Sequence, residues 1–196
     1  MLDPNVNRGY KTIPQQHVGG RELDYSRGIG LGGSSIINFQ FWTTGAKGDY
    51  EEWAERVGDD SFNWENAQRL FKRIENYHLE NTKSNKHYIS LEPAIHGSSG
   101  AVDIEFTERL MDEVTTSVDE IITTGIKKNL DLNSGDPIGI GIAPNTSKHG
   151  YRVTAKTAYL DHALTNLTIM SNHTVHRLLL EGNKAIGVVT NNETCK

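Results

Sequence analysis

The sequence has one cysteine, few apolar residues and no long hydrophobic run. Because Cys195 stands alone, an intrachain disulfide and a cysteine-built metal site are both excluded. No stretch approaches the roughly 18 apolar residues that a membrane-spanning helix needs, so we expect no membrane partner. The first residues also lack the charged and then apolar layout of a secretory signal peptide. The residues therefore leave the compartment of the protein open.

Charge of a single sign is also scarce. The 20 Lys and Arg and the 25 Asp and Glu are interspersed, with a net charge of −5, and no basic stripe is present to neutralise a phosphate backbone. We therefore expect no nucleic-acid partner. Apolar residues make up 36% of the chain and mean hydropathy is −0.53, which is polar for a self-sufficient domain of this length and compatible with part of a larger protein. Nothing in the residues indicates an oligomeric state.

Hydrophobic periodicity predicts a mixed α/β (α+β) chain. Apolar residues repeat at three and four positions over 49–57 and 64–77, after Thr107 as far as Gly125, and over 154–164, and these patterns predict helices. Strand-like runs occupy 101–106, 167–170, 175–180 and 185–190, and the turn "EGNK" joins the last two. The polar stretch 78–100 predicts a long connection between two lobes of the chain. The regular βαβ spacing of a complete doubly wound sheet is missing.

Gly28, Gly30 and Gly33 spell G-x-G-x-x-G, the pattern of a nicotinamide dinucleotide turn. In such a turn a buried strand delivers the first glycine, and the helix that follows directs its N–H groups at the pyrophosphate. The residues before Gly28, "GGRELDYSR", are charged and interrupted, so they cannot form a central parallel strand. A nicotinamide-dependent dehydrogenase therefore stays an alternative that only the literal glycine match supports.

The second half of this stretch indicates a different glycine device. Gly32 and Gly33 let the backbone approach a ligand closely, and Ser34 and Ser35 add hydroxyl donors. The apolar residues 36–38 can begin a helix whose N-terminus faces the same point, an arrangement that suits a phosphate. The competing interpretation is an ordinary helix cap that contains serines.

The segment "RGIGLGGSSIINFQFWTTGAKGDYEEWA" resembles the first signature of the glucose-methanol-choline (GMC) oxidoreductases. The resemblance continues through "FNWENAQRLFKRIE", "HGSSGAVDI", "GYRVTAKTAYL" and "NLTIMSNHTVHRLLLEGNKAIGVV", and so covers about Tyr10 to Val189. The signature positions that match are Gly32, Gly33, Ser34, Ser35, Asn38, Trp42, Gly45, Asp49, Tyr50 and Trp53.

The resemblance implies an FAD-dependent enzyme that oxidises the CH–OH group of a small-molecule alcohol, with hydride transfer to flavin N5. It implies an incomplete Rossmann-like FAD domain with part of the substrate domain: 1–77 as an FAD-binding segment, 78–150 as a connection with a partial substrate domain, and 151–196 as the return to the FAD domain. By resemblance, Arg27 and Gly32, Gly33, Ser34 and Ser35 would lie at the pyrophosphate and ribitol. Asn38, Phe39, Gln40 and Phe41 would lie beside the isoalloxazine, and Val175 would offer its backbone to the adenine. From spacing alone, Val175 is an ordinary strand residue.

The sequence also departs from the family pattern. Ile29 and Thr44 stand where relatives usually carry a basic residue and often an arginine. The dinucleotide turn that begins the relatives and the catalytic histidine near their end have no counterpart here, so we predict no catalytic residue and weak or absent FAD binding by this chain. His173 and His176 would point to opposite faces of a strand, and we predict no metal site. An inactive remnant that partners a full-length relative is therefore the second alternative.

Overall fold

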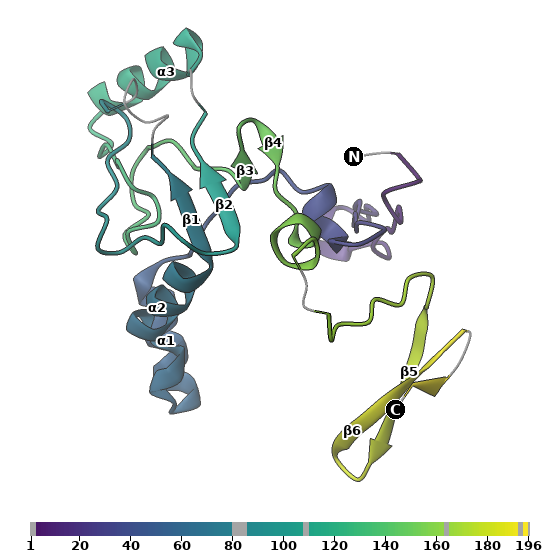
Figure 1. Ribbon diagram of the computed structural model, residues 1–196. Helices are drawn as coiled ribbons and strands as arrows, with labels where there is room; N and C mark the ends of the chain where they lie inside the picture. Colours follow the sequence, from purple (N-terminus) through teal and green to yellow (C-terminus); the bar gives the residue numbers. More distant parts are fainter. Residues whose placement is uncertain (1–2, 80–85, 108–109, 163–164, 192–193, 196) are drawn as a thin grey trace. The chain divides into compact units, whose positions relative to one another are not determined.

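The computed structural model describes residues 3–79, 86–107, 110–162, 165–191 and 194–195, which form two compact units, Met1–His162 and Ala163–Lys196. The larger unit contains the helices α1 (Lys47–Val57), α2 (Trp64–Ile74) and α3 (Asp112–Thr123) (Figure 1). Its strands are β1 (Glu75–His78), β2 (Val102–Glu105), β3 (Ser147–Lys148) and β4 (Tyr151–Arg152). The smaller unit contains β5 (Val175–Glu181), β6 (Lys184–Thr190) and β7 (Thr194–Cys195). The mixed α/β class is confirmed.

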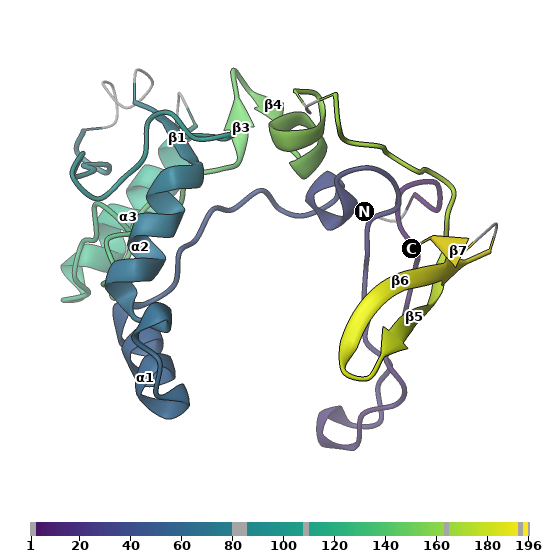
Figure 2. The ribbon, with the colours of Figure 1, turned by 60° about the horizontal axis from the view of Figure 1, so that its bottom comes forward.

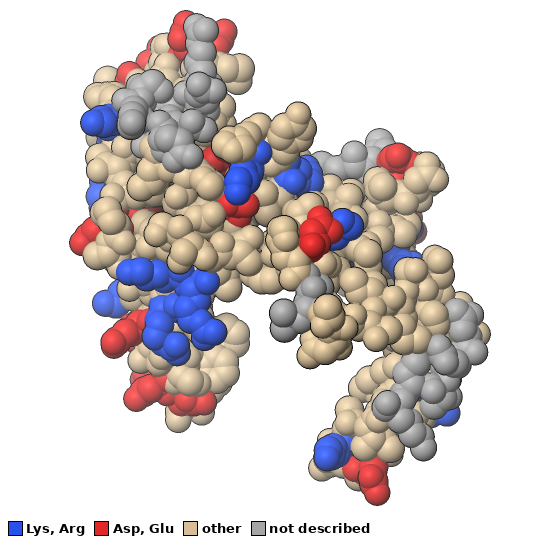
Figure 3. Space-filling view, in the orientation of Figure 1, with Lys and Arg blue, Asp and Glu red and all other residues tan. Residues whose placement is uncertain are grey.

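Local capping explains where the first two helices begin and end. Helix α1 ends at Gly58, whose left-handed φ of 67° lets its N–H reach the carbonyls of Ala54 and Glu55. Helix α2 begins after Asn63, whose side chain accepts a hydrogen bond from the Asn66 N–H. Lys72 and Arg73 lie in its last turn, where positive charge suits the helix dipole, and Figure 3 shows basic side chains gathered over this helix.

The predicted helix over 64–77 is three residues too long. At Glu75 the backbone becomes extended, with φ −76° and ψ 138°, and Glu75–His78 pairs in parallel with Val102–Glu105. The strand buries Tyr77 and the Glu75 side chain, so tertiary packing overrides the helical pattern of the sequence. The strand predicted over 101–106 is confirmed as β2.

Two further helices differ from the pattern. Thr107 does not cap α3, because the N-cap is Met111 and the helix begins at Asp112; residues 108 and 109 lie outside the described part. The segment predicted as a helix over 154–164 contains a five-residue π-helical turn, Lys156–Leu160, and residues 163 and 164 of that prediction are not described. Residues 167–170, predicted as a strand, have no regular structure.

The core of the larger unit forms around the β1–β2 pair. Tyr77 and Ile104 from this pair are buried together with Ile89 and with Phe106, which directly follows β2, and Trp42 packs against them. Ile104 is fully buried, with 0% of its surface exposed. No helix among the described residues is long and apolar enough to cross a membrane.

The N-terminal residues form a loose antiparallel ladder. Isolated bridges join Asn7 to Gly28, Lys11 to Asp24 and Gln15 to Arg21, and a 3-10 turn at Gln16–Val18 closes it (Figure 2). In the smaller unit, β5 and β6 form the predicted hairpin, and β7 adds a third antiparallel strand that the sequence did not indicate. Gly182, at φ 59°, supplies the left-handed residue of the hairpin turn.

The role of Asn63 in capping α2 can be tested by substitution. Replacing Asn63 by alanine removes the acceptor of the Asn66 N–H and should lower the free energy of unfolding by about 1 kcal/mol, measured by urea denaturation of the chain. Asn63→Asp keeps the acceptor and adds negative charge at the helix N-terminus, so it should preserve or slightly raise stability. Equal destabilisation by both substitutions would contradict the capping role.

Candidate functional site

The glycine-serine turn forms a tight backbone loop that only glycine allows. Gly30, Gly32 and Gly33 have φ values of 115°, 99° and 55°, in the left-handed region that other residues rarely adopt. A Cβ at Gly28 would lie 2.1 Å from the Gly33 carbonyl oxygen, and one at Gly32 would lie 3.3 Å from the Lys156 nitrogen. At Gly33 a Cβ would meet no atom within 4 Å. The turn is therefore closed on one side and open to a close approach at Gly33.

The surroundings of this turn differ from those of a nicotinamide dinucleotide turn. Gly28 lies on the irregular N-terminal ladder, where an isolated antiparallel bridge joins it to Asn7, and no buried parallel strand precedes it among the described residues. The helix predicted to begin at residues 36–38 is also wrong, because the chain forms a 3-10 turn, Gly33–Ile36, with Ile37 as its C-cap. The N-cap of this turn is Gly32, without a side-chain bond, so the serines are not helix caps either.

The two serines have different environments. Ser35 Oγ donates to the Gly32 carbonyl at 2.6 Å and accepts the Ala155 N–H at 2.9 Å. Because a hydroxyl has one proton, Ser35 stabilises the loop and cannot also donate to a ligand in this geometry. Ser34 Oγ accepts the Gly28 N–H at 3.2 Å, which leaves its own proton for another acceptor. Ser34 is thus the hydroxyl donor that fits the predicted role.

Arg152 connects the turn to the segment that follows. Its Nη1 donates to the Ser35 carbonyl at 3.2 Å, to the Asn38 carbonyl at 2.9 Å and to Asn38 Oδ1 at 2.8 Å. Asn38 Oδ1 in addition accepts the Gln40 N–H at 3.1 Å. The predicted site residue Asn38 is therefore a hydrogen-bonding centre that fixes the chain between the turn and Gln40.

Residues 39–41 present two aromatic rings beside this centre. Phe39 and Phe41 are 70% and 65% exposed. Gln40 has a left-handed φ of 66°, and the Thr146 N–H donates to its carbonyl at 2.8 Å. Paired backbone holds this strained residue in place, and rings on either side stay accessible to a flat ligand.

Two cavities adjoin the segment. One, of about 350 Å³, is lined by residues that include Ser35, Asn38, Phe41 and Tyr159. The other, of about 530 Å³, has a polar lining that includes Gln40, Glu105 and His149. The Glu105 carboxylate is buried and accepts the N–H groups of His149 and Gly150 at 2.9 and 2.8 Å. Gln40 is thus placed at the margin of a polar cavity.

Arg27 and Val175 complete the predicted set. The Arg27 side chain is exposed, lies over the Tyr25 ring at 3.8 Å and donates to the Ser26 carbonyl at 2.6 Å. Its guanidinium can bind a phosphate oxygen. Val175 is the first residue of β5, is 54% exposed and belongs to the smaller unit. No group of three metal-ligating side chains occurs in the part of the chain that the structure describes.

Thr44 is buried in a hydrogen-bond network of its own. Asn133 Oδ1 accepts the Thr44 N–H at 2.9 Å, and the Tyr50 hydroxyl donates to the Thr44 carbonyl at 2.6 Å. Burial, followed by the charge of Asp49, raises the pKa of Tyr50, so this donor keeps its proton. Asn133 and Tyr50 therefore hold the Thr44 backbone in place through its N–H and its carbonyl.

Comparison with known proteins identifies the family of this sequence. The sequence model of GMC oxidoreductases matches residues 15–196. The chain belongs to the GMC oxidoreductase family. The match covers all the predicted site residues, and the GMC resemblance of the signature is confirmed.

Several GMC relatives are similar over most of this chain. Pyranose dehydrogenase from Agaricus campestris is 30% identical, over 91% of this chain and 30% of its own length. An alcohol dehydrogenase [acceptor] from Pseudomonas putida is 32% identical, over 93% of this chain and 32% of its own length. The crystal structure of pyridoxine 4-oxidase from Mesorbium loti is 26% identical with a TM-score of 0.82, over 97% of this chain and 36% of that one. This GMC chain spans about a third of the length of these relatives.

Sequence reasoning missed residues that shape the site from far along the GMC chain. Arg152, Thr146 and Ala155 all bond to the 32–40 segment, from more than 100 positions away. The "GYRV" motif at 150–153 was a signal for Arg152, since its resemblance to the family was visible. Its partners were not, because spacing does not reveal which distant backbone a guanidinium meets.

The hydrogen bonds of Arg152 to Ser35 and Asn38 can be tested by substitution. Arg152→Gln removes the charged donor to Ser35 and Asn38, and we expect FAD affinity to fall about threefold while the far-ultraviolet circular dichroism spectrum stays unchanged. Arg56→Gln is the matched control, because Arg56 is exposed and pairs with Glu52 on α1, away from the turn. Equal FAD affinity in the two variants would contradict the role of Arg152.

Proposed function

We propose that this chain supplies the part that binds the flavin in an FAD-dependent oxidoreductase, which oxidises the CH–OH group of a small-molecule alcohol. One observation carries the proposal: the glycine-serine turn is open at Gly33, is braced by Arg152, and continues directly into two exposed aromatic rings. This order of groups matches the order of phosphate, ribitol and ring along a flavin nucleotide. Membership of the GMC family supports the same cofactor.

The residues present fit the groups of FAD. The Gly33 backbone can approach a phosphate without a side chain in the way, and Ser34 and Arg27 add a hydroxyl donor and a guanidinium. Asn38 to Phe41 would flank the isoalloxazine. When bound, FAD supplies the hydride acceptor. The residues of this chain would bind and orient the cofactor, and none of them is assigned a proton transfer.

The polar cavity beside Gln40 suits a hydroxylated substrate. Its lining offers the Gln40 amide, the Glu105 carboxylate and the imidazole of His149, which can donate to or accept from alcohol groups. Two relatives, a pyranose dehydrogenase and an alcohol dehydrogenase, carry substrates of this chemistry in their names. We propose a small alcohol as the substrate class.

Fluorescence anisotropy of flavin tests the proposal on the chain as it exists. Because the described site offers few charged contacts to the phosphates, we expect weak binding of FAD, with a dissociation constant of about 0.1 to 1 mM. NAD should compete at least about tenfold more weakly, since no buried parallel strand leads into the Gly28–Gly33 turn in the part of the chain that the structure describes. Tighter binding of NAD than of FAD, or no FAD binding at these concentrations, would contradict the proposed function.

A further inference from the structure

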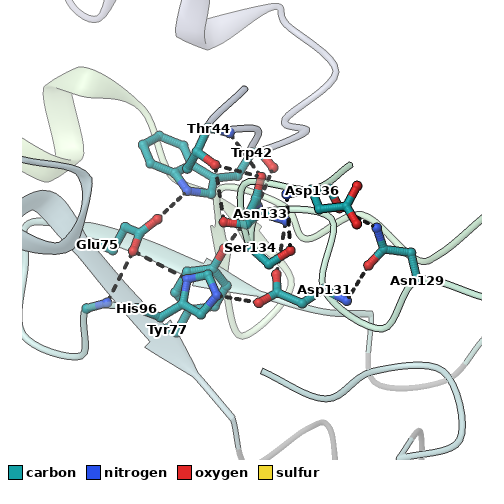
Figure 4. A network of polar contacts seen from close by, with 11 residues as sticks. Trp42, Thr44, Glu75, Tyr77, His96, Asn129, Asp131, Asn133, Ser134 and Asp136 are labelled. Carbon is teal, nitrogen blue, oxygen red and sulfur yellow. Dashed lines mark hydrogen bonds and ion pairs between the residues drawn. The ribbon is translucent and has the colours of Figure 1, made fainter. Parts of the chain in front are cut away.

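A buried cluster of charged side chains is hydrogen-bonded to Trp42, the residue that follows the proposed flavin-site segment Asn38–Phe41. His96 Nε2 is 2.8 Å from Asp131 Oδ2, and His96 Nδ1 faces Glu75 Oε2 at 3.6 Å (Figure 4). The side chains of Glu75, His96 and Asp131 are 1%, 6% and 11% exposed. Two carboxylates buried this deeply need a cation between them, because an unpaired buried charge is costly. His96 is the group placed to carry that charge.

Glu75 links His96 directly to the segment that leads from the flavin site. Its Oε1 accepts the Trp42 indole N–H at 2.9 Å, while its Oε2 accepts the Gly97 N–H at 3.1 Å. The Glu75 carboxylate therefore holds Trp42 on one side and the His96 loop on the other. Trp42 follows Phe41 in the chain. The position of Trp42 therefore constrains the backbone that carries the exposed Phe41 ring.

Asp131 links His96 to the same segment by a second path. Its Oδ1 accepts the Asn133 N–H at 3.0 Å. The Asn133 side chain then donates to the Trp42 carbonyl at 3.1 Å and accepts the Thr44 N–H at 2.9 Å. Figure 4 shows the path through Glu75 ending at the Trp42 indole, and the path through Asp131 and Asn133 ending at the Trp42 carbonyl and at Thr44. A closed ring of contacts thus runs from His96 through each carboxylate to residues 42–44.

We propose that His96 is a positioning residue for the flavin site: as a cation between Glu75 and Asp131, it fixes residues 42–44 and through them the Asn38–Phe41 segment. The meaning of this role for cofactor binding rests on the proposed function. The positioning itself does not, since it concerns contacts within the chain. Removing the charge would leave two buried carboxylates repelling each other at the ends of both paths.

The titration of His96 agrees with the geometry. Burial alone would lower the pKa of His96, but its contacts with Asp131 and Glu75 outweigh burial and raise it to about 9. Among the described residues, the titratable groups that face His96 are Glu75 and Tyr77 on β1 and Asp131 on its loop. Burial raises the pKa of Tyr77 far above its ordinary value, so Tyr77 stays neutral across this range.

Nuclear magnetic resonance of the isotope-labelled chain, without flavin, tests the proposal. We expect both ring nitrogens of His96 to carry protons at pH 7 and to titrate near pH 9, and the Trp42 indole and Thr44 amide signals to shift with the same midpoint. The Trp53 indole is the internal control, because it is exposed and stacks on Phe62. Titration of His96 near pH 6.5, or Trp42 and Thr44 signals that do not follow it, would overturn the proposal.

The His96→Gln substitution provides a second, independent test of the proposal. In His96→Gln the Trp42 indole proton should exchange with solvent at least about tenfold faster than in the unsubstituted chain, because one charge-assisted anchor is lost. His17→Gln, at an exposed histidine in the N-terminal ladder, should leave that rate unchanged. An unchanged rate in His96→Gln would overturn the proposal, and if this variant does not fold, the titration of the unsubstituted chain decides. Absent FAD binding would contradict the proposed function and leave these flavin-free results standing.

Discussion

Replacing Gly28 by alanine is expected to abolish detectable FAD binding while the core of the larger unit stays folded. The new Cβ would lie 2.1 Å from the Gly33 carbonyl oxygen and 2.6 Å from its carbon. Both are backbone atoms, so the clash is relieved only by displacing the turn that carries Gly32 to Ser35. A loss of at least about tenfold from an already weak affinity should leave no measurable anisotropy change.

The control for this substitution is another glycine with room for a methyl group. Gly48 lies in α1, has no left-handed φ, and a Cβ there would meet nothing within 4 Å. Gly48→Ala should therefore bind FAD as the unsubstituted chain does and gain up to about 1 kcal/mol of helix stability. The core around Tyr77 and Ile104 is distinct from the turn, so circular dichroism should change little in either variant. FAD binding by Gly28→Ala at normal strength would show that the turn does not hold the cofactor.

The second large effect is a loss of stability in alkaline solution. The pKa of His96 is about 9 in the folded chain and about 6.5 in an unfolded one, so the folded state binds the proton more tightly. This contribution is fully present below about pH 6.5 and disappears as the pH rises toward 9. The shift corresponds to at most about 3 kcal/mol of unfolding free energy. Urea denaturation at several pH values between 6 and 9.5 measures it.

A substitution of His96 tests whether this residue causes the pH dependence of the unfolding free energy. His96→Gln should unfold at lower urea than the unsubstituted chain at pH 6.5, and the difference should shrink as the pH approaches 9. His17→Gln should keep the full pH dependence, because His17 is exposed. Stability of the unsubstituted chain that stays constant or rises from pH 6.5 to 9 would contradict a buried imidazolium.

Local chemistry made much of the fold predictable. The start of α2, the strand at 102–105 and the hairpin at 175–190 were visible because their signals lie within a few residues. The end of α2 was not, since the extended backbone at Glu75 is stabilised by pairing with Val102, 27 positions away. The apolar run 167–170 failed for a related reason: β propensity alone does not provide a partner strand.

The site was predictable to a similar extent. The glycines and serines of 32–35 formed a pattern with a physical meaning, and the structure shows why glycine is required there. What spacing could not reveal was the different roles of the two serines, because Ser35 donates its one hydroxyl proton to the Gly32 carbonyl whereas Ser34 only accepts a hydrogen bond from the Gly28 N–H. The cluster around His96 was equally hidden, because its carboxylates come from β1 and from a loop with no periodic pattern.

Residue-resolved mapping of FAD binding by nuclear magnetic resonance tests the central claim most directly. When FAD is added to the isotope-labelled chain, the amide signals of Gly32, Gly33, Ser34 and Asn38 to Phe41 should shift most, and an equal concentration of NAD should leave them nearly unchanged. Shifts confined to other parts of the chain, such as the exposed face of α1 and α2, would contradict the account.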